Sequence, residues 1–539
     1  MSTVGQILVD SLVANGIDRL FCVAGESYIG LLDALWGRKE IEAVACRHEA
    51  GAGFMALADA RLTGRPGVAC VSRGPGASNA AIAVHTAQQD GVPLILIVGQ
   101  VPRRNSRRDA FQEIDYGRMF GSIAKWTAEL LDPDRVSEVL LRAVQVATQG
   151  QPGPVVIAIP EDVLDAQTTA PVALPQAAIA AAPAPLDLAI LREWLSRASR
   201  PLVIAGGDIG RCDAREALRL FVECWVLPTA VSFRNHDLFP NTHRLYAGDL
   251  GLANPPQQMA VMGESDLLLV FGARLSDITT QGFTFPRPGR THMLLVHVHP
   301  DHTVIGTHFA ADLGIACSTR ALINAVGEPH SSVKSREAWI DRLRAEQRKI
   351  ARPRSFDVDD GVPFESVVDV IGRHLPGDAI VTLDAGTFAA PAYRLIPFTP
   401  PQRLLAPASG AMGFGVPAAV AAALRAPRRP VICLVGDGGF LMTGNELAVA
   451  SERRLPLKII LSENGMYASI RIHQERAYPG RAVATTFTNP DFELLGRAFG
   501  CTVTRIRSSG DLVSLPEVLA RPGLELVIVD TSVKAVMPE

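Results

Sequence analysis

A glycine-rich turn between two apolar segments constrains this chain more than any other part of its sequence. Residues 431–435 (VICLV) are apolar throughout, which is typical of a strand buried on both faces of a parallel sheet. Gly436-Asp437-Gly438-Gly439 follows directly, then a helical pattern and a second apolar segment, 457–461, that runs into Asn464-Gly465. This order predicts a β-α-β unit with Asp437 at the end of one strand and Asn464 at the end of the next.

Strand ends of this kind form binding sites, because the carboxyl ends of neighbouring parallel strands open into one crevice. A glycine turn lets backbone N–H groups approach a bulky anion such as a diphosphate. Asp437, Asn464 and a backbone carbonyl beside Asn464 are oxygen ligands of the kind that Mg²⁺ combines with phosphates and water. In the alternative interpretation Asp437 only caps a helix, but the second polar strand end, 27 residues later, favours the metal site.

The stretch 431–471 resembles the GDG…N signature of the thiamine diphosphate enzymes. The resemblance implies that Asp437, Asn464 and the backbone carbonyl of Met466 bind Mg²⁺. It also implies that the diphosphate of the cofactor lies against the glycines of the turn, Gly436, Gly438 and Gly439. Glu463 stands where the family usually has the first of two Asn residues, and this departure leaves the ligand Asn464 in place.

Glu49 follows another predicted strand, 41–46, and begins an Ala- and Gly-rich helix. Taken alone, it could simply be a first-turn carboxylate that the helix dipole favours. The segment 47–56 (RHEAGAGFMA) is similar to the sequence around the activating glutamate of the thiamine diphosphate family. The resemblance implies that Glu49 hydrogen-bonds N1′ of the aminopyrimidine and promotes removal of the C2 proton, most effectively in a dry pocket.

Two turns in the last third of the chain match further cofactor contacts of the family. Gly386 and Thr387 follow a predicted strand, and the resemblance assigns both to the diphosphate. The turn 408–417 (ASGAMGFGVP) leads into an Ala-rich helix, for which close packing of the helix on the sheet is the structural explanation. The resemblance adds that the Gly410 carbonyl accepts a hydrogen bond from the 4′-amino group and that Met412 is the apolar wedge that bends the cofactor.

The segment 107–115 (RRDAFQEID) resembles the AFQE-x-D segment of acetolactate synthases, a branch of this family. The resemblance implies that Phe111 and Gln112 face the substrate, and these two side chains complete the predicted catalytic set with Glu49. A purely structural interpretation is the start of a surface helix with Asp109 as its N-cap.

Length and composition exclude several classes of protein. A chain of 539 residues is too long for one hydrophobic core and suggests three domains, and its net charge of −3 argues against nucleic-acid binding. Eight scattered cysteines without a CxxC pair indicate buried thiols rather than disulfides or zinc. The first residues lack a basic segment and prolines interrupt the Ala-rich run 169–190, so we expect a cytoplasmic protein without a signal peptide or membrane span.

Strand and helix patterns alternate along the chain, which predicts an α/β fold with parallel sheets covered by helices on both faces. Together with the resemblance, which covers essentially the whole chain, this predicts three doubly wound domains. We expect a pyrimidine-binding domain at 1–165, a linker at 166–186, a central Rossmann-like domain at 187–335, a linker at 336–360 and a diphosphate-binding domain at 361–539. Asp187 is the expected N-cap of the first central helix.

The central domain of such enzymes binds FAD in acetolactate synthases and ADP or CoA in some relatives. Gly272-Ala273-Arg274 matches a flavin-contacting segment of the family. The expected Gly-Met-His-Gly segment is missing, and 246–251 (YAGDLG) stands roughly in its place. FAD is therefore considered but not favoured, and ADP, CoA or an empty scaffold domain stay open.

The shared chemistry of the family is attack on the carbonyl carbon of a 2-oxo acid with loss of CO₂, followed by protonation or by capture of a second carbonyl. Phe111-Gln112 favours an acetolactate synthase-like carboligase that acts on a 2-oxo acid such as pyruvate. The runner-up is a non-ligating 2-oxo acid or oxalyl-CoA-type decarboxylase, or a 2-hydroxyacyl-CoA lyase. The adjacent His-His pair of aldehyde-forming decarboxylases is absent from the pyrimidine-binding part of the sequence.

Glu49 and the Asp437 turn lie in different predicted domains, and in the family the cofactor lies between two subunits. The resemblance therefore implies a homodimer or homotetramer whose active sites form between subunits, with a 2-oxo acid or acyl-CoA as the small-molecule substrate. A non-catalytic scaffold of the same fold would have lost Glu49, Asp437 or Asn464, and all three are present.

Overall fold

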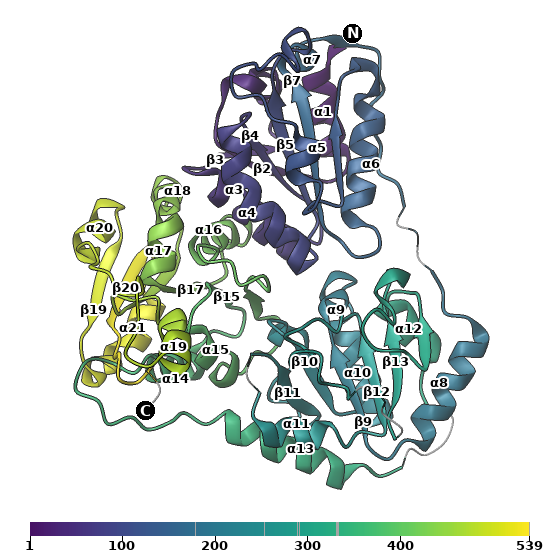
Figure 1. Ribbon diagram of the computed structural model, residues 1–539, viewed down its shortest axis with the longest axis vertical. Helices are drawn as coiled ribbons and strands as arrows, with labels where there is room; N and C mark the ends of the chain where they lie inside the picture. Colours follow the sequence, from purple (N-terminus) through teal and green to yellow (C-terminus); the bar gives the residue numbers. More distant parts are fainter. Residues whose placement is uncertain are drawn as a thin grey trace.

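Three α/β domains follow one another along the chain in the computed structural model (Figure 1). The structure describes residues 1–177, 179, 181–252, 254–287, 289, 292–329 and 334–537. Each domain is built on a six-stranded sheet whose neighbouring strands pair in parallel, with helices on both faces. The predicted α/β class with three doubly wound domains is confirmed.

The first sheet has the strand order β3-β2-β4-β5-β7-β6. Its strands are β2 Arg19–Cys22, β3 Glu42–Ala45, β4 Gly67–Val71, β5 Leu94–Gln100, β6 Trp126–Glu129 and β7 Pro154–Pro160. The helices of this domain are α1 Val4–Ala14, η1 Glu26–Tyr28, α2 Ile29–Leu35, α3 Glu49–Thr63, α4 Pro75–Asp90, η2 Arg103–Asn105, α5 Tyr116–Phe120, η3 Pro133–Arg135, α6 Val136–Thr148 and α7 Glu161–Leu164. Two short strands, β1 Ser2–Thr3 and β8 Gln167–Thr168, pair antiparallel beside it.

The central sheet has the order β11-β10-β9-β12-β13-β14, so the direction of winding reverses between β9 and β12. Its strands are β9 Pro201–Ala205, β10 Thr229–Ser232, β11 Tyr246–Leu250, β12 Leu267–Phe271, β13 Leu294–Val298 and β14 Leu313–Ile315. The helices are α8 Pro185–Arg197, α9 Gly207–Arg211, α10 Arg215–Trp225, η4 His236–Leu238, α11 Pro256–Met262, η5 His302–Val304, α12 Thr319–Val326 and α13 Glu337–Ile350. A reversal of this kind opens a crevice at the carboxyl ends of the strands.

The third sheet has the order β16-β15-β17-β18-β20-β19. Its strands are β15 Ile380–Leu383, β16 Arg403–Leu405, β17 Val431–Gly436, β18 Lys458–Glu463, β19 Thr502–Ile506 and β20 Glu525–Asp530. The helices are α14 Phe364–His374, α15 Ala389–Leu395, α16 Gly415–Arg425, α17 Asp437–Thr443, η6 Gly444–Glu446, α18 Leu447–Glu452, α19 Ala468–Ala477, α20 Phe492–Ala498, η7 Ser509–Ser514 and α21 Leu515–Ala520.

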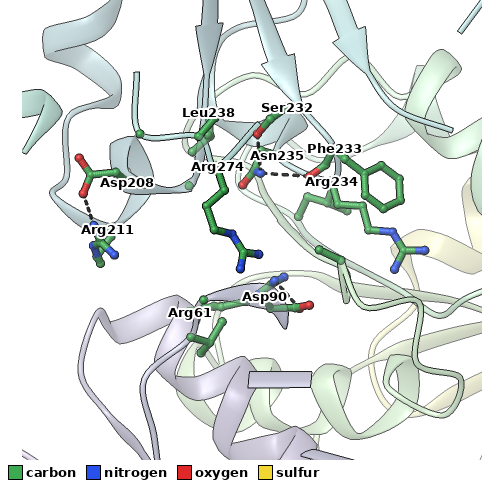
Figure 2. Close-up of a pocket in the computed structure, with 18 of the residues that line it drawn as sticks. Arg61, Asp90, Asp208, Arg211, Ser232, Phe233, Arg234, Asn235, Leu238 and Arg274 are labelled. Atoms are coloured by element: carbon green, nitrogen blue, oxygen red, sulfur yellow. Dashed lines mark hydrogen bonds and ion pairs between the residues drawn. The ribbon is translucent and has the colours of Figure 1, made fainter. Parts of the chain in front are cut away.

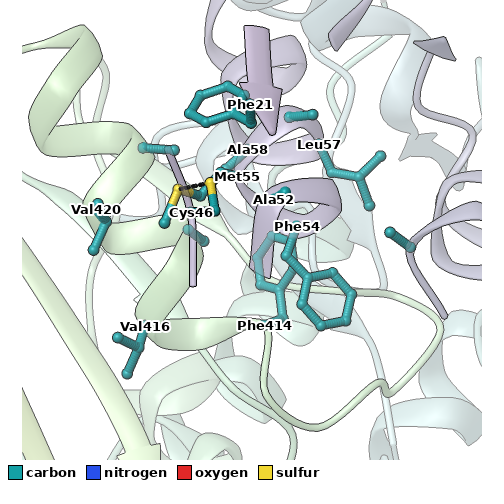
Figure 3. Packing of buried hydrophobic residues seen from close by; sticks show 14 of the residues in the cluster. Phe21, Cys46, Ala52, Phe54, Met55, Leu57, Ala58, Phe414, Val416 and Val420 are labelled. Carbon is teal, nitrogen blue, oxygen red and sulfur yellow. Dashed lines mark hydrogen bonds between the residues drawn. The ribbon is translucent and has the colours of Figure 1, made fainter. Parts of the chain in front are cut away.

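The first and third domains pack through α3 and α16, two helices rich in small residues (Figure 3). Residues 50–60 of α3 are all buried, as expected for a helix that is apolar on every side. The rings of Phe54 and Phe414 meet edge to face, with their centroids 5.6 Å apart. A Cβ at Gly53 would lie 2.3 Å from the Cβ of Ala83, so a larger residue there would force α3 away from α4.

Two helices lie at the boundaries of the central domain. Helix α13 lies inside the predicted linker 336–360 and buries Trp339 and Leu343 against the central domain. The prediction that Asp187 caps the first central helix is wrong: α8 begins at Pro185 with Ala184 as its N-cap, and Asp187 lies in the first turn. Proline suits the first helical position because that position needs no N–H donor.

Candidate functional site

Three adjacent strands of the third sheet bring the predicted cofactor residues together. β15, β17 and β18 are neighbours, and they lead into Gly386-Thr387, Asp437 and Asn464 respectively. The Phe388 ring packs beside the first two of these turns. A Cβ atom added to Gly386 would lie 2.3 Å from Phe388 Cε1, and one added to Gly436 would lie 3.0 Å from the same atom. This close approach explains the glycines at both positions.

Asp437 begins α17, and backbone N–H groups hold its carboxylate in place. Its side chain is 2% exposed, and Oδ1 accepts a hydrogen bond of 2.8 Å from the Gly438 nitrogen. Oδ2 accepts hydrogen bonds from the backbone nitrogens of Asn464, at 2.9 Å, and Gly465, at 2.7 Å. The two polar strand ends therefore meet directly, as expected for neighbouring parallel strands.

The Asn464 amide oxygen lies in the same turn and accepts a hydrogen bond of 3.1 Å from the Met466 nitrogen. An amide oxygen has two lone pairs, so this bond leaves Asn464 able to bind a cation. Gly465 adopts a φ of 65°, the left-handed conformation that glycine tolerates best. In the chain that the structure describes there is no group of three or more His, Cys, Asp or Glu side chains suited to a metal, so a cation here would need amide and carbonyl oxygens.

The Met412 side chain, from the turn that contains Gly410, approaches the Asp437 turn at Gly438. A Cβ at Gly438 would lie 3.4 Å from Met412 Cε and 2.5 Å from Tyr467 Cε1, so both side chains approach the Asp437 turn. Gly410 adopts a φ of 72°, and a Cβ there would meet no atom within 4 Å. The Met412 side chain therefore lies against the Asp437 turn.

Asp384 fixes the position of this second turn. Its Oδ1 accepts a hydrogen bond of 3.0 Å from the Gly413 nitrogen, and its Oδ2 accepts one of 2.9 Å from the Gly415 nitrogen. The carboxyl group is fully buried, and burial raises the pKa of Asp384 to about 6. The end of β15 is thereby tied to the turn that carries Met412.

Glu463, the departure from the family's Asn-Asn pair, has a partner of its own. Its carboxylate lies 2.9 Å from the Arg505 guanidinium, which also pairs with Asp530 at 2.6 Å. Burial raises the pKa of Glu463, and Arg505 counteracts that rise. This network ties Glu463 to β19 and β20, which carry Arg505 and Asp530 respectively.

Glu49 is the first residue of α3 and is partly exposed. The Asn79 amide donates a hydrogen bond of 2.9 Å to its Oε2, and a Cβ at Gly76 would lie 3.3 Å from its Oε1. Among the described residues of the single chain, no hydrogen bond or ion pair joins Glu49 to the Asp437 turn. One chain therefore does not bring these two parts of the predicted site into contact.

Glu446, at the end of η6, lies beneath the start of α3 and is fully buried. Its carboxylate accepts hydrogen bonds from the backbone nitrogens of Arg47 and His48. Burial raises the pKa of Glu446 to about 7, although these backbone donors act in the opposite direction. Negative charge on Glu49 adds to the rise.

The loop with the predicted substrate residues packs on the turn beside Glu49. A Cβ at Gly74 would lie 2.7 Å from the Gln112 carbonyl oxygen, and the Gly74 nitrogen donates a 3.0 Å hydrogen bond to the Tyr116 hydroxyl. Gln112 is partly buried, whereas Phe111 is 75% exposed. The loop therefore presents a large apolar side chain to the outside of the single chain.

The alternative interpretation of this segment, a surface helix with Asp109 as its N-cap, is wrong. Arg107, Asp109 and Gln112 have φ values of 60°, 57° and 64°, which no right-handed helix permits. The next helix begins at Tyr116, and its N-cap is Asp115, whose carboxylate accepts from the Arg118 nitrogen at 3.0 Å. Left-handed conformations at non-glycine residues are strained, and they often accompany functional loops.

A cavity of about 680 Å³ lies where the three domains meet, at the carboxyl ends of β9, β10 and β12 (Figure 2). Arg61 pairs with Asp90 at 2.7 Å on its wall, while Arg234 and Arg274 bond to backbone carbonyls rather than to carboxylates. Arg234 also stacks on the Phe233 ring at 4.8 Å. The cavity therefore holds two guanidinium groups without an acidic partner among the described residues.

Sequence reasoning did not single out Asp384, Glu446 or Asn489. Asn489 donates a hydrogen bond of 2.9 Å to Asp437 Oδ2 from a loop 52 residues away, and no spacing rule marks it. Glu446 had a detectable signal, because it is a lone acidic residue between apolar segments of a helical pattern, which predicts a buried carboxylate.

Within the described part of the chain, no helix is long and apolar enough to cross a membrane.

Comparisons with known proteins match this architecture domain by domain. Residues 2–119 match the family model described as thiamine pyrophosphate enzyme, N-terminal TPP binding domain. Residues 188–326 match the central domain of the same family, and residues 384–529 match its C-terminal TPP binding domain. The first and third matches contain Glu49 and Asp437 respectively.

Three curated relatives span nearly the whole chain. The acetolactate synthase isozyme 3 large subunit of Escherichia coli is 30% identical over 98% of this chain and 94% of its own length. The acetolactate synthase large subunit of Parasynechococcus marenigrum is 32% identical over 93% and 82%, and that of Corynebacterium glutamicum is 29% identical over 95% and 83%. The chain therefore belongs to the thiamine pyrophosphate enzyme family and is a thiamine diphosphate-dependent, acetolactate synthase-like enzyme.

Proposed function

We propose that the enzyme uses thiamine diphosphate and Mg²⁺ to decarboxylate a 2-oxo acid such as pyruvate and to join the remaining acyl unit to a second carbonyl compound. The observation that carries this proposal is the meeting of Asp437 and Asn464 at neighbouring strand ends of the domain matched to TPP binding. The printed names of the relatives, acetolactate synthases, support carboligation as the reaction class.

The donor set at the Asp437 turn suits Mg²⁺. Asp437 is a buried carboxylate whose partners in the described chain are N–H groups, without a Lys or Arg side chain. An ionised carboxylate in such a place is costly unless a cation compensates it. Asn464 and the Met466 carbonyl would add neutral oxygens, and Mg²⁺ accepts few protein ligands beside phosphate and water.

Bound thiamine diphosphate supplies a nucleophilic carbon and a sink for the electron pair that CO₂ leaves behind. The chain would hold the diphosphate at Gly386-Thr387 and at the turn 436–439, with Met412 as the apolar contact. Glu49 would accept or donate one proton in a hydrogen bond to the aminopyrimidine. The Asn79 amide donates its hydrogen bond to Glu49 Oε2, so the other carboxylate oxygen, Oε1, is available for that contact.

The substrate is proposed to lie beside Phe111 and Gln112. Their loop packs on Gly74, and Gly76 of the same turn faces Glu49, so the loop and the proposed activating group share one rim of the first sheet. A partly buried amide such as Gln112 can orient a carboxylate or carbonyl by hydrogen bonding, while an exposed phenyl ring such as Phe111 can exclude water once covered.

Exposed arginines near Phe111 and Gln112 favour a second candidate function. Arg104, Arg107 and Arg108 of the same loop are exposed, and their guanidinium groups form no ion pair among the described residues. Three free guanidinium groups suit the phosphates of an acyl-CoA. An oxalyl-CoA-type decarboxylase or a 2-hydroxyacyl-CoA lyase is therefore the alternative.

FAD is not the favoured ligand of the central cavity. The segment 246–251, which replaces the family's flavin-contacting segment, mostly forms edge strand β11. Arg234 and Arg274 suit the phosphates of FAD, ADP or CoA equally, so they do not single out a flavin. The absorption spectrum of the purified protein tests this point, and a stoichiometric flavin spectrum would contradict it.

A homodimer or homotetramer is the proposed assembly. One chain leaves Glu49 and the Asp437 turn without mutual contact, and it exposes apolar side chains close to both, with Leu441 and Met442 each 47% exposed on α17 and Ile82 40% exposed on α4. Burial of these side chains against a second copy would be favourable at roughly 25 cal/mol per Å².

Turnover of a substrate panel tests the reaction. We expect the protein with thiamine diphosphate and Mg²⁺ to release CO₂ from pyruvate and to form acetolactate. CO₂ without a ligated product would select the non-ligating decarboxylase, and cleavage of a 2-hydroxyacyl-CoA alone would select the lyase. No turnover of any 2-oxo acid or acyl-CoA would contradict both candidates.

A further inference from the structure

The loop that follows α19 bonds to the backbone of residues 465–467 and reaches Asp437. Met466 and Thr486 form an antiparallel bridge, and the Phe487 nitrogen donates a 2.9 Å hydrogen bond to the Gly465 carbonyl. The rings of Tyr467 and Phe487 pack with their centroids 4.9 Å apart. The segment 485–489 is therefore fixed to the turn that carries Asn464.

This loop places Asn489 against Asp437. The Asn489 Nδ2 atom donates a hydrogen bond of 2.9 Å to Asp437 Oδ2, the oxygen that also accepts from the nitrogens of Asn464 and Gly465. Asn489 is the only side chain among the donors to this carboxylate in the described chain, since the others are backbone groups.

The other end of the same amide has no partner. Asn489 Oδ1 is buried and accepts no hydrogen bond in the structure, although the residue as a whole is only half-buried. A buried acceptor without a donor is unfavourable, and in native proteins it commonly marks an absent water or ion. Turning the amide over would not remove the problem, because Oδ1 would then face Asp437 Oδ2, an acceptor.

We propose that Asn489 is a positioning residue of the Mg²⁺ centre, an inference that rests on the proposed Mg²⁺-dependent function. Its Nδ2 group orients the Asp437 carboxylate, and its Oδ1 atom accepts a hydrogen bond from a water molecule bound to the metal. Mg²⁺ usually keeps several water molecules, and each of them needs acceptors around the site. Side chains that orient metal ligands in this way typically change metal affinity 10- to 100-fold when they are replaced.

Three variants of the full-length protein test this role. In Asn489→Leu both interactions are lost, and in Asn489→Asp the oxygen acceptor is retained. Thr488→Ala, at the exposed neighbouring residue, is the matched control. Mg²⁺ is titrated calorimetrically into each protein in the presence of excess thiamine diphosphate, at a temperature where circular dichroism shows every variant folded.

We expect Asn489→Leu to bind Mg²⁺ at least about 10-fold more weakly than the wild type. Asn489→Asp should bind Mg²⁺ more weakly than the wild type but more tightly than Asn489→Leu, because it keeps the oxygen acceptor but loses the Nδ2 donor to Asp437, and Thr488→Ala should match the wild type. Wild-type affinity in Asn489→Leu, or equal loss in Asn489→Asp, would overturn the inference. Failure of the wild type to bind Mg²⁺ and thiamine diphosphate would instead contradict the proposed function itself.

Discussion

The carboxylate of Glu446 accepts a hydrogen bond of 2.9 Å from the backbone nitrogen of His48, a residue 398 positions earlier in the chain. His48 immediately precedes Glu49, so the third domain holds the peptide that presents the proposed activating group. Gly51 permits this approach, because a Cβ there would lie 2.3 Å from Glu446 Oε1. The positions of the first and third domains are thus coupled at the start of α3.

Glu446 should make the stability of the protein depend on pH. Burial raises its pKa from 4.5 to about 7, so between these values the folded protein retains a proton that the unfolded chain has released. The free energy of unfolding should therefore fall as pH rises from about 4.5 to 7, by on the order of 3 kcal/mol from this group. Glu446→Gln, which cannot ionise, should remove this part of the slope, as measured by urea unfolding at pH 5 and pH 8.

Comparison of Glu446→Gln with the wild type at two pH values isolates the contribution of this carboxyl group. The stability of Glu446→Gln relative to the wild type should be greater at pH 8 than at pH 5, because only the wild type loses a proton in that interval. An equal difference at the two pH values would show that Glu446 does not titrate there.

The contact between Phe54 and Phe414 should contribute measurably to the docking of the first domain on the third. Both rings are buried, with exposures of 1% and 0%, so Phe54→Ala should lower the free energy of unfolding by about 3–5 kcal/mol. Phe111→Ala, at a phenylalanine 75% exposed, is the matched control and should change it by less than about 0.5 kcal/mol. A cost below 1 kcal/mol for Phe54→Ala would argue against the observed packing.

Replacement of Glu49 should impair catalysis without loss of the cofactor. Glu49→Gln keeps the shape of the side chain, but an amide cannot exchange a proton with the aminopyrimidine as a carboxyl group can. We therefore expect kcat to fall by about 10²- to 10⁴-fold. Calorimetric affinity for thiamine diphosphate should change little, since the Asp437 turn is intact. Full activity in this variant would refute the role proposed for Glu49.

Mixed oligomers should reveal whether active sites are shared between subunits. If Glu49 of one subunit serves the Asp437 turn of another, a dimer of one Glu49→Gln chain and one Asp437→Ala chain contains one intact site. Co-expression of the two inactive variants with different affinity tags should therefore restore activity to the doubly tagged complex. A complex that stays inactive would place both residues of each site in the same subunit.

The sequence predicts the strands buried on both faces better than it predicts the edges of the sheets. β5, β12 and β17 are continuous apolar segments, and their sequence patterns alone identify them as parallel strands. Edge strand β6 (WTAE) is partly exposed and mixes polar with apolar residues, so no simple period marks it. Its place follows from pairing with β7, which is a tertiary interaction.

The candidate site likewise contains residues that the sequence predicts and residues that it does not. Asp437 and Asn464 are predictable because both lie next to strands of recognisable pattern, and chain topology alone brings neighbouring strand ends together. Asn489 reaches Asp437 from an irregular loop whose course depends on backbone pairing with Gly465 and Tyr467. Similarly, helix α8 begins before Asp187 because Pro185 already satisfies the first helical position, and N-cap preference alone does not capture this.

Calorimetric titration of thiamine diphosphate, with and without Mg²⁺, tests the central claim most directly. The wild-type protein should bind the cofactor tightly only when Mg²⁺ is present, and Asp437→Ala should abolish that dependence together with tight binding. Folding of the variant is checked by circular dichroism at the same temperature. Binding that is unaffected by Mg²⁺ or by Asp437→Ala would contradict the assignment of this turn as the metal and diphosphate site.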